Sequence, residues 1–200
     1  LVHWPGHYFN NPDKSARLAE FMNALKENGK ATTIGLSNFQ SQNLTLLGDQ
    51  LKTFSMNEVP YSLLDRAYEG DTLNLCKNAD IPYMAFSPTA QGLLAKPMSR
   101  EDLEMPTRKQ HFLYQNSVYT HAKIVWETVR DVANEICCKP VEVALAWVLT
   151  RDNIFTAIVG SRKPEQVQEF AKSTELKLNS NQLQRLTKAS DQFPMVKKGH

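Results

Sequence analysis

The chain has 200 residues, of which 42% are hydrophobic and 22% charged, as in an ordinary soluble globular protein. This length allows one sizeable hydrophobic core, so we expect a single domain over residues 1–200. The formal net charge is only +2, and the Lys and Arg residues are scattered along the chain. These features argue against nucleic acid or an acidic membrane surface as a partner.

The three cysteines, Cys76, Cys137 and Cys138, cannot pair fully, and their spacing fits no zinc site. We therefore expect reduced thiols in a cytoplasmic protein, without a metal site. No apolar run approaches the roughly 20 residues that a membrane helix needs, and no signal-peptide pattern opens the chain. The sequence starts at Leu1 in what looks like the end of a buried strand. We interpret this start as that of a fragment or a truncated product.

Short apolar runs alternate with helical patterns, and most runs end in polar or Gly/Pro-containing turns. In chain order, we expect a strand at 1–3, a helix at 15–28, a strand at 31–38, a helix around 41–51, a strand at 55–59, a helix that includes 71–78 and a strand at 82–87. A long polar segment, 88–116, is typical of a functional lid or a disordered stretch. After it we expect helices at 119–136 and 141–150, a strand at 155–159, a helix from Pro164, and a helix at 180–190 capped by Ser180.

This alternation predicts an α/β fold with a mainly parallel sheet. It does not distinguish a five-stranded doubly wound sheet from part of a (β/α)8 barrel. In both folds, ligands bind at the carboxyl ends of the strands. The residues at those ends are therefore the first place to look for a functional site.

The strand ends carry an imidazole, an indole, a hydroxyl-amide pair, an aromatic ring and a small-residue loop with two cations. The segments are His3-Trp4, Ser37-Asn38, Asn57-Glu58, Phe86-Ser87 and Gly160-Ser161-Arg162-Lys163. Such a set suits a planar heteroaromatic ring at one end and a phosphate at the other. Taken singly, each segment also has an ordinary explanation as a turn, a cap, core packing or solvated charge. Only their order along the chain favours a shared site.

In that order, the segments resemble the motifs of the aldo-keto reductase family. The matching stretches are LVHWPG, GKATTIGLSNF, NEVPYSLLDR, IPYMAFSPTAQGLLA, ALAWVL and AIVGSRKPEQVQE. The resemblance runs nearly end to end. It implies a (β/α)8 TIM-type barrel, of which this chain would hold the fourth to eighth strands and lack the first three.

The resemblance also implies roles for individual residues. His3 matches the histidine that polarises the substrate carbonyl, and Trp4 matches a residue of the substrate pocket. The nicotinamide would contact Ser37, Asn38, Glu58 and Phe86. The pyrophosphate would contact Ser87, Thr89 and Gln91. The adenosine 2′-phosphate and adenine would contact Gly160, Ser161, Arg162, Lys163, Gln166 and Glu169. The two cations favour NADP(H), because NADH lacks the phosphate that would pair with them.

The sequence departs from the family pattern in three ways. Glu58 stands where glutamine is usual, and a carboxylate accepts hydrogen bonds but does not donate them. Phe170 stands where many relatives have asparagine. The family's catalytic Asp, Tyr and Lys come from strands upstream of the histidine motif, and that motif begins this chain. We transfer those three roles to no residue here.

The leading hypothesis is therefore an NADPH-dependent oxidoreductase that reduces an aldehyde or ketone to an alcohol by hydride transfer. The alternative is a truncated, non-catalytic nucleotide-binding or structural remnant of the same family. Five strands of a barrel leave unpaired edges, so we expect self-association or an upstream segment to cover them, and little activity from the chain alone. The expected partner is a small carbonyl substrate.

Overall fold

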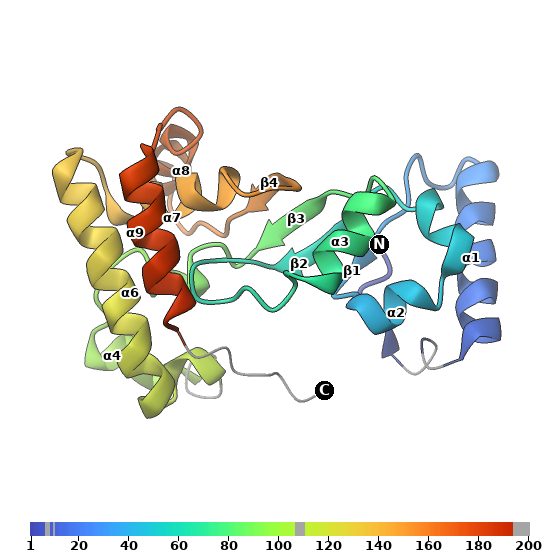
Figure 1. Cartoon of the computed structure of the whole chain (residues 1–200), viewed down its shortest axis with the longest axis horizontal. Coiled ribbons are helices and arrows are strands. Elements are labelled where there is room, and N and C mark those ends of the chain that lie inside the picture. Colours follow the sequence, from blue (N-terminus) through green and yellow to red (C-terminus); the bar gives the residue numbers. More distant parts are fainter. Residues whose placement is uncertain (7–8, 10, 107–110, 194–200) are drawn as a thin grey trace. The chain divides into compact units, whose positions relative to one another are not determined.

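The computed structural model describes residues 1–6, 9, 11–106 and 111–193, in which helices and short parallel strands alternate (Figure 1). The chain forms two compact units. Unit 1 comprises residues 1–60, 68–86 and 152–156, and unit 2 comprises residues 61–67, 87–151 and those from 157 on. In the described residues, no helix is long and apolar enough to cross a membrane.

The sheet consists of β1 (Leu36–Ser37), β2 (Asn57–Pro60), β3 (Tyr83–Phe86) and β4 (Ile154–Ile158), in that order. The β1–β2 and β2–β3 pairs are parallel, and Val2 adds a parallel bridge to Leu36. The strands therefore follow one another in space as they do along the chain, without the reversal of a doubly wound sheet. This order agrees with a (β/α)8 type of fold and confirms the predicted parallel α/β class.

In unit 1, α1 (Pro12–Glu27) contacts η2 (Gly48–Thr53), while α2 (Ser41–Thr45) contacts α3 (Asp71–Asn78). Asn11 caps α1 by accepting from the backbone N–H groups of Asp13 and Lys14. Phe21 of α1 is 60% exposed. The helix instead buries Ser15, Ala19 and Met22, a face that Phe21 does not share at 100° per residue.

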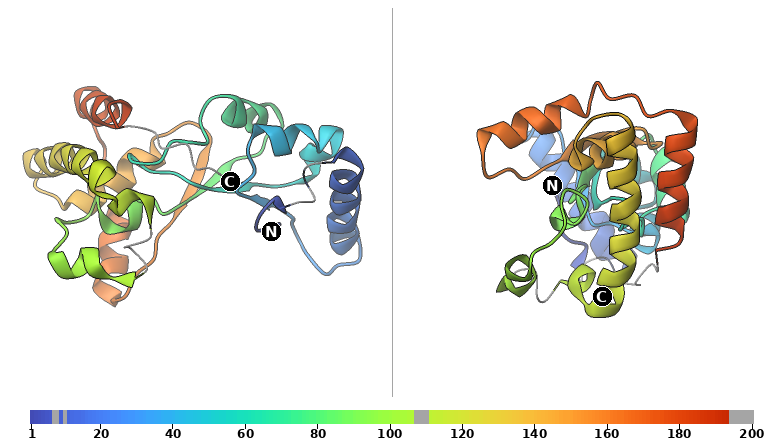
Figure 2. Two further views of the ribbon diagram at one scale, coloured as in Figure 1. Left: turned by 90° about the horizontal axis from the view of Figure 1, so that it is seen from below. Right: turned by 90° about the vertical axis from the view of Figure 1, so that its left-hand side faces the viewer.

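Unit 2 is centred on α7 (Pro140–Leu149), whose residues from Val141 to Val148 are all buried. A helix apolar on every side needs neighbours on every side. Contacts with α7 come from α6 (Asn116–Glu135) and α8 (Pro164–Lys172), and α6 also contacts α9 (Ser180–Asp191). The yellow α6 and red α9 run alongside each other in both figures (Figures 1 and 2). Trp147 is fully buried, stacks on Tyr61 at 6.0 Å, and donates to Thr187 Oγ1 at 3.1 Å.

The predicted long loop, 88–116, was only partly right. It contains η3 (Ala90–Gly92), α4 (Arg100–Glu104) and η4 (Phe112–Tyr114), while residues 107–110 lie outside the described part. Ser99 and Asp102 form a capping box that starts α4, a local signal that the sequence prediction overlooked. The cap of α9 is also corrected, because the side chain of Asn179, not Ser180, accepts from Gln182 N at 2.9 Å.

Candidate active site

Three predicted nicotinamide contacts share one face of the sheet in unit 1. The register pairs Ser37 with Glu58, and Glu58 with Met84. Side chains of paired residues in parallel strands lie on the same face of the sheet, so Ser37, Glu58 and Met84 share one face. Phe86 is two positions after Met84 in β3 and therefore lies on that face as well. Ser37 is buried, whereas Glu58 and Phe86 are half-buried. The face therefore combines a hydroxyl, a carboxylate and an aromatic ring.

Asn38 ends β1 in the left-handed region, with φ of 64°. Asparagine tolerates this conformation better than most other residues with a side chain. Its Nδ2 donates to His3 O and to Ser37 Oγ, both at 3.0 Å. This arrangement uses both amide hydrogens. Asn38 Oδ1 has no protein donor among the described residues, yet it is not one of the fully enclosed polar atoms. The side chain thus ties His3 to β1 and leaves one acceptor available.

The turn after Asn38 is held by three polar residues whose roles the sequence analysis missed. Asn57 donates to Phe39 O at 2.9 Å and accepts from Phe39 N at 3.4 Å. Tyr68 donates to Asn38 O at 3.2 Å, and Tyr83 donates to Tyr68 O at 2.9 Å. All three are buried, which makes their hydrogen bonds costly to lose. Their only sequence signal was a polar group within an apolar run.

Cys76 lies behind this turn, with its Sγ 3.9 Å from Asn57 Nδ2. Burial raises the pKa of the Cys76 thiol to about 11, and hydrogen bonds from Asn57 and Tyr83 oppose that shift. The thiol therefore stays neutral and packs as a small apolar group. Cys76, Cys137 and Cys138 form no disulfide in the structure.

His3 and Trp4 are both exposed, with ring centroids 6.0 Å apart and planes tilted by 58°. Trp4 is 49% exposed, which is unusual for so large an apolar side chain. The backbone of His3 is fixed by Asn38, whereas its ring is open to solvent. The imidazole is thus placed at a strand end and remains accessible to a ligand.

In unit 2, the predicted pyrophosphate contacts form a strained turn after β3. Ser87, Ala90 and Gln91 have φ values of 51°, 51° and 59°. Gln91 Nε2 donates to Ser87 Oγ at 3.1 Å, and the Tyr114 hydroxyl donates to Gln91 O at 2.9 Å. Thr89 is half-buried and precedes η3. Clustered positive φ values of non-glycine residues are characteristic of ligand-binding turns.

The loop before α8 carries the predicted 2′-phosphate contacts. Gly160, Ser161, Arg162 and Lys163 are all exposed. Gln166 Oε1 accepts from Arg162 N at 2.8 Å and from Lys163 N at 3.1 Å. Gln166 thereby occupies the backbone N–H groups of Arg162 and Lys163, which could otherwise bind an anion. An anion at this loop would therefore have to be bound by side chains. Glu169 forms an ion pair with Lys139 of the α7 cap.

Comparison with known proteins identifies the family. The Aldo/keto reductase family model matches residues 1–191. The chain belongs to the aldo-keto reductase family. It is 27% identical over 164 residues to an NADH-specific methylglyoxal reductase of Escherichia coli, covering 82% of this chain and 50% of that protein.

Two further relatives are similar at comparable levels. A versiconal hemiacetal acetate reductase of Aspergillus parasiticus is 28% identical over 185 residues, covering 87% of this chain and 53% of that protein. The uncharacterized oxidoreductase YrpG of Bacillus subtilis is 29% identical over 171 residues, covering 83% of this chain and 50% of that protein. The chain thus spans about half the length of these curated relatives. The aldo-keto reductases are oxidoreductases that use nicotinamide cofactors, and the names of these relatives agree with that chemistry.

Proposed function

We propose that the protein containing this chain is an NADPH-dependent carbonyl reductase that converts an aldehyde or ketone to an alcohol. The observation that carries the proposal is the Ser37-Asn38 pair at the end of β1. Asn38 Oδ1 can accept, and the Ser37 hydroxyl has no acceptor among the described residues. One acceptor beside one donor complements a primary carboxamide, which is the polar group of nicotinamide.

Other residues of unit 1 extend this match. Phe86 offers an apolar ring on the same face as Ser37, suited to stacking against a planar heterocycle. Glu58 adds a carboxylate beside Ser37. Its negative charge would favour the oxidised, cationic nicotinamide over the neutral reduced form. We therefore propose that Glu58 tightens NADP⁺ binding relative to NADPH.

In unit 2, Arg162 and Lys163 support NADP(H) over NAD(H). Both side chains are exposed, and neither has a carboxylate partner among the described residues. Two unpaired cations beside Ser161 suit a dianionic phosphate, which NADP(H) carries and NAD(H) lacks. The Escherichia coli relative is named NADH-specific, so cofactor choice needs a direct test.

The bound cofactor would supply hydride, and His3 would polarise the substrate carbonyl beside Trp4. We propose that the family's Asp, Tyr and Lys, together with three further strands, lie outside these 200 residues. Phe155 of β4 is 73% exposed and Ile158 is 38% exposed, which supports an additional covering segment or self-association. Under this proposal, the chain alone is catalytically incompetent.

Cofactor discrimination by Arg162 and Lys163 tests the proposal. Arg162→Ala and Lys163→Ala should each weaken NADPH binding by about 1.5 kcal/mol, roughly tenfold, because each removes a charge-assisted contact. NADH binding should change less than about twofold. The measurement is a fluorescence titration of both reduced cofactors, with the native upstream sequence included. Lys172→Ala, at the other end of α8, is the matched control. Equal losses for both cofactors would refute recognition of the 2′-phosphate.

A further inference from the structure

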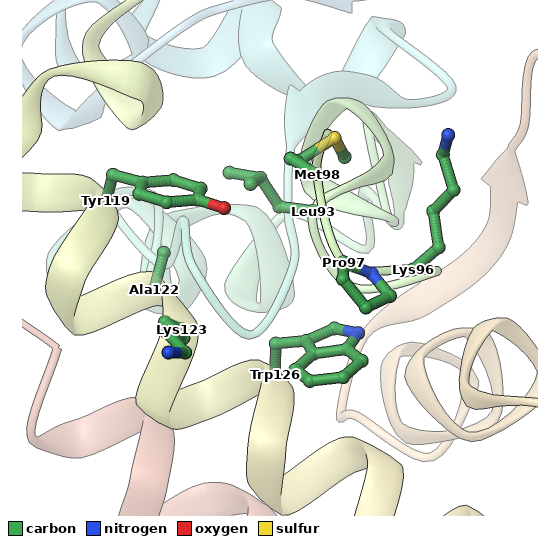
Figure 3. Close-up of a pocket in the computed structure, with 8 residues that line it drawn as sticks. All are labelled: Leu93, Lys96, Pro97, Met98, Tyr119, Ala122, Lys123 and Trp126. Atoms are coloured by element: carbon green, nitrogen blue, oxygen red, sulfur yellow. The ribbon is translucent and has the colours of Figure 1, made fainter. Parts of the chain in front are cut away.

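The helix α6 carries two features that the proposed cofactor contacts do not use, a cavity along its first half and a pair of thiols just after its end. The cavity lies between residues 93–98 and α6 and has a volume of about 60 Å³ (Figure 3). Ligand pockets usually enclose roughly 300–1,000 Å³, so we assign this cavity no ligand. The thiols belong to Cys137, which is exposed, and Cys138, which is half-buried. They are the better placed of the two features to bind a ligand.

Cys137 occupies a position after α6 at which glycine is usual. Its φ is 54°, in the left-handed region. The Cys137 N–H donates to Asn134 O at 3.4 Å, and the Cys138 N–H donates to Ala133 O at 3.0 Å. This pair of hydrogen bonds is a common ending of an α-helix, and the left-handed residue within it is most often glycine. The turn therefore fixes the backbone of both cysteines, while the Cys137 side chain lies at the surface.

The two neighbouring sulfur atoms can share one ligand atom more easily than they can bond to each other. The peptide bond between Cys137 and Cys138 is trans, so the two α-carbons are about 3.8 Å apart. Disulfides usually join α-carbons about 4.4–6.8 Å apart, so a direct disulfide would close a small, strained ring. One atom inserted between the sulfurs enlarges that ring. The Cys138 thiol can turn towards such an atom at little cost, because it makes only a weak hydrogen bond to Lys139 O at 3.7 Å.

A buried carboxylate beside the thiols favours a ligand without negative charge. Glu142 is 7% exposed, and its side chain has no hydrogen-bond or ion-pair partner among the described residues. Burial, followed by the charges of Glu142 and Cys137, raises the pKa of the Cys138 thiol to about 11. The nearby Lys139 is already paired with Glu169. The uncompensated charge of Glu142 should therefore repel an anion and leave an uncharged ligand unaffected.

The small number of ligating groups identifies the kind of atom that fits. In the described part of the chain, no group of three or more His, Cys, Asp or Glu side chains could hold a metal ion, so the pair does not suit zinc, which takes four ligands. Trivalent arsenic needs only two thiols from the protein, because its third substituent stays in place. We propose that Cys137 and Cys138 form a binding site for uncharged trivalent arsenicals of the type R–As(OH)₂.

Binding exchanges two As–OH bonds for two As–S bonds. The two thiol protons leave with the two hydroxyl groups as water, and arsenic remains trivalent, so the step needs no oxidant or reductant. The second As–S bond forms within one molecule, which makes the two-thiol complex far more stable than a complex with one thiol. Neither cysteine is among the residues assigned above to the cofactor. The inference therefore does not depend on the proposed reductase function, and either can fail without the other.

Phenylarsine oxide, which hydrates to this form in water, is the probe, and intact-protein mass spectrometry gives the stoichiometry. The wild-type chain should gain one phenylarsenic group in place of two hydrogens, with the third cysteine, Cys76, unchanged because it is buried. The adduct should survive millimolar glutathione, a monothiol, and should be removed by dimercaptopropanol, a dithiol. Circular dichroism before and after treatment checks that the chain stays folded.

Single-cysteine variants separate binding by two thiols from the reaction of one thiol. Cys137→Gly preserves the left-handed turn, and Cys138→Ala removes the half-buried thiol. Each variant should bind phenylarsine oxide at least about 100-fold more weakly, because the second As–S bond is lost. The affinities are measured by competition with dimercaptopropanol. Cys76→Ala is the matched control and should leave the affinity unchanged.

The effect of Glu142 is tested with two alkylating reagents of similar size, the uncharged iodoacetamide and the anionic iodoacetate. In Glu142→Gln, alkylation of Cys138 by iodoacetate should become about two- to fivefold faster relative to alkylation by iodoacetamide, because a repelling charge is removed. Mass spectrometry of the digested chain gives both rates. An unchanged ratio would refute the selection against anions.

Two results would overturn the proposed site. One is a wild-type adduct that millimolar glutathione removes, which would mean that arsenic is held by a single thiol. The other is equal affinity of the wild-type chain and either single-cysteine variant for phenylarsine oxide, which would show that the two thiols do not act together.

Discussion

Replacement of Asn38 should reveal how a strained strand end and a proposed cofactor contact depend on one side chain. The residue has φ of 64° and donates from Nδ2 to His3 O and Ser37 Oγ. Losing two hydrogen bonds costs about 2 kcal/mol. An alanine at this position loses about 1–2 kcal/mol more, because its side chain strains the left-handed backbone conformation. A glycine avoids that strain but loses about 0.5–1 kcal/mol, because it gives the unfolded chain more conformational entropy.

We therefore expect Asn38→Ala to lower the free energy of unfolding by about 3–4 kcal/mol, and Asn38→Gly by about 2.5–3 kcal/mol. Glycine should thus be better tolerated than alanine, the reverse of the order in a regular strand. Urea unfolding monitored by circular dichroism gives the midpoint urea concentration of each variant. If the dependence of the unfolding free energy on urea concentration is unchanged, a shifted midpoint reports a change in stability.

Asn153 is the matched control, because it has φ of 63° and donates from Nδ2 to Ile81 O at 2.9 Å. Its variants should show the same preference for glycine, with smaller losses because only one hydrogen bond is removed. Cofactor binding should fall in the Asn38 variants alone. If alanine is tolerated as well as glycine at position 38, the left-handed strain does not govern this site and the reasoning is wrong.

Three further predictions follow from other parts of the structure. Thr187→Val removes the acceptor of the buried Trp147 indole and should cost about 1–3 kcal/mol in thermal unfolding. Thr128→Val in α6 removes only an exposed hydrogen bond to Ile124 O and should change stability by less than about 0.5 kcal/mol. Folding raises the pKa of the Cys76 thiol from 9.0 to about 11, so the thiol of the unfolded chain loses its proton first as the pH rises. The free energy of unfolding should therefore fall between pH 9.0 and about 11, by up to about 1.4 kcal/mol per pH unit. Cys76→Ala should reduce that slope in urea titrations at alkaline pH. The 200-residue chain alone should not reduce an aldehyde panel with NADPH, since general acid catalysis contributes about 10²–10⁴-fold; robust turnover abolished by His3→Ala would contradict this expectation.

The elements predicted best from the sequence were those whose boundaries have local chemical signals. Residues 71–78, expected to lie within a helix, form α3, and α8 begins at Pro164 as predicted. The helix α7 begins at Pro140, one residue before its predicted start. Proline fits the first helical turn whatever surrounds it, so this signal needs no tertiary information. The parallel order of the strands was also predicted correctly, with help from the family resemblance.

Predictions failed where tertiary contacts decide the structure. The strand expected at 31–38 is reduced to Leu36 and Ser37, because only these residues pair with β2. The exposure of Phe21 and the buried network of Asn57, Tyr68 and Tyr83 likewise depend on which surfaces meet in the fold. Residue type alone does not reveal that Asn57 holds the backbone of Phe39. Such roles become visible only when both partners have been placed.

The proposed cofactor contacts in unit 1 and those in unit 2 should respond differently to mutation. In unit 1, Asn38 stabilises the turn and presents an acceptor with the same amide, so a change there must alter folding and binding together. In the loop before α8, Gln166 stabilises the backbone, while the Arg162 and Lys163 side chains remain without protein partners in the described residues. Those two side chains can change without loss of internal contacts. Cofactor preference is therefore expected to be adjustable at Arg162 and Lys163 at little cost in stability, whereas the Ser37-Asn38 end is constrained by the fold that it helps to form.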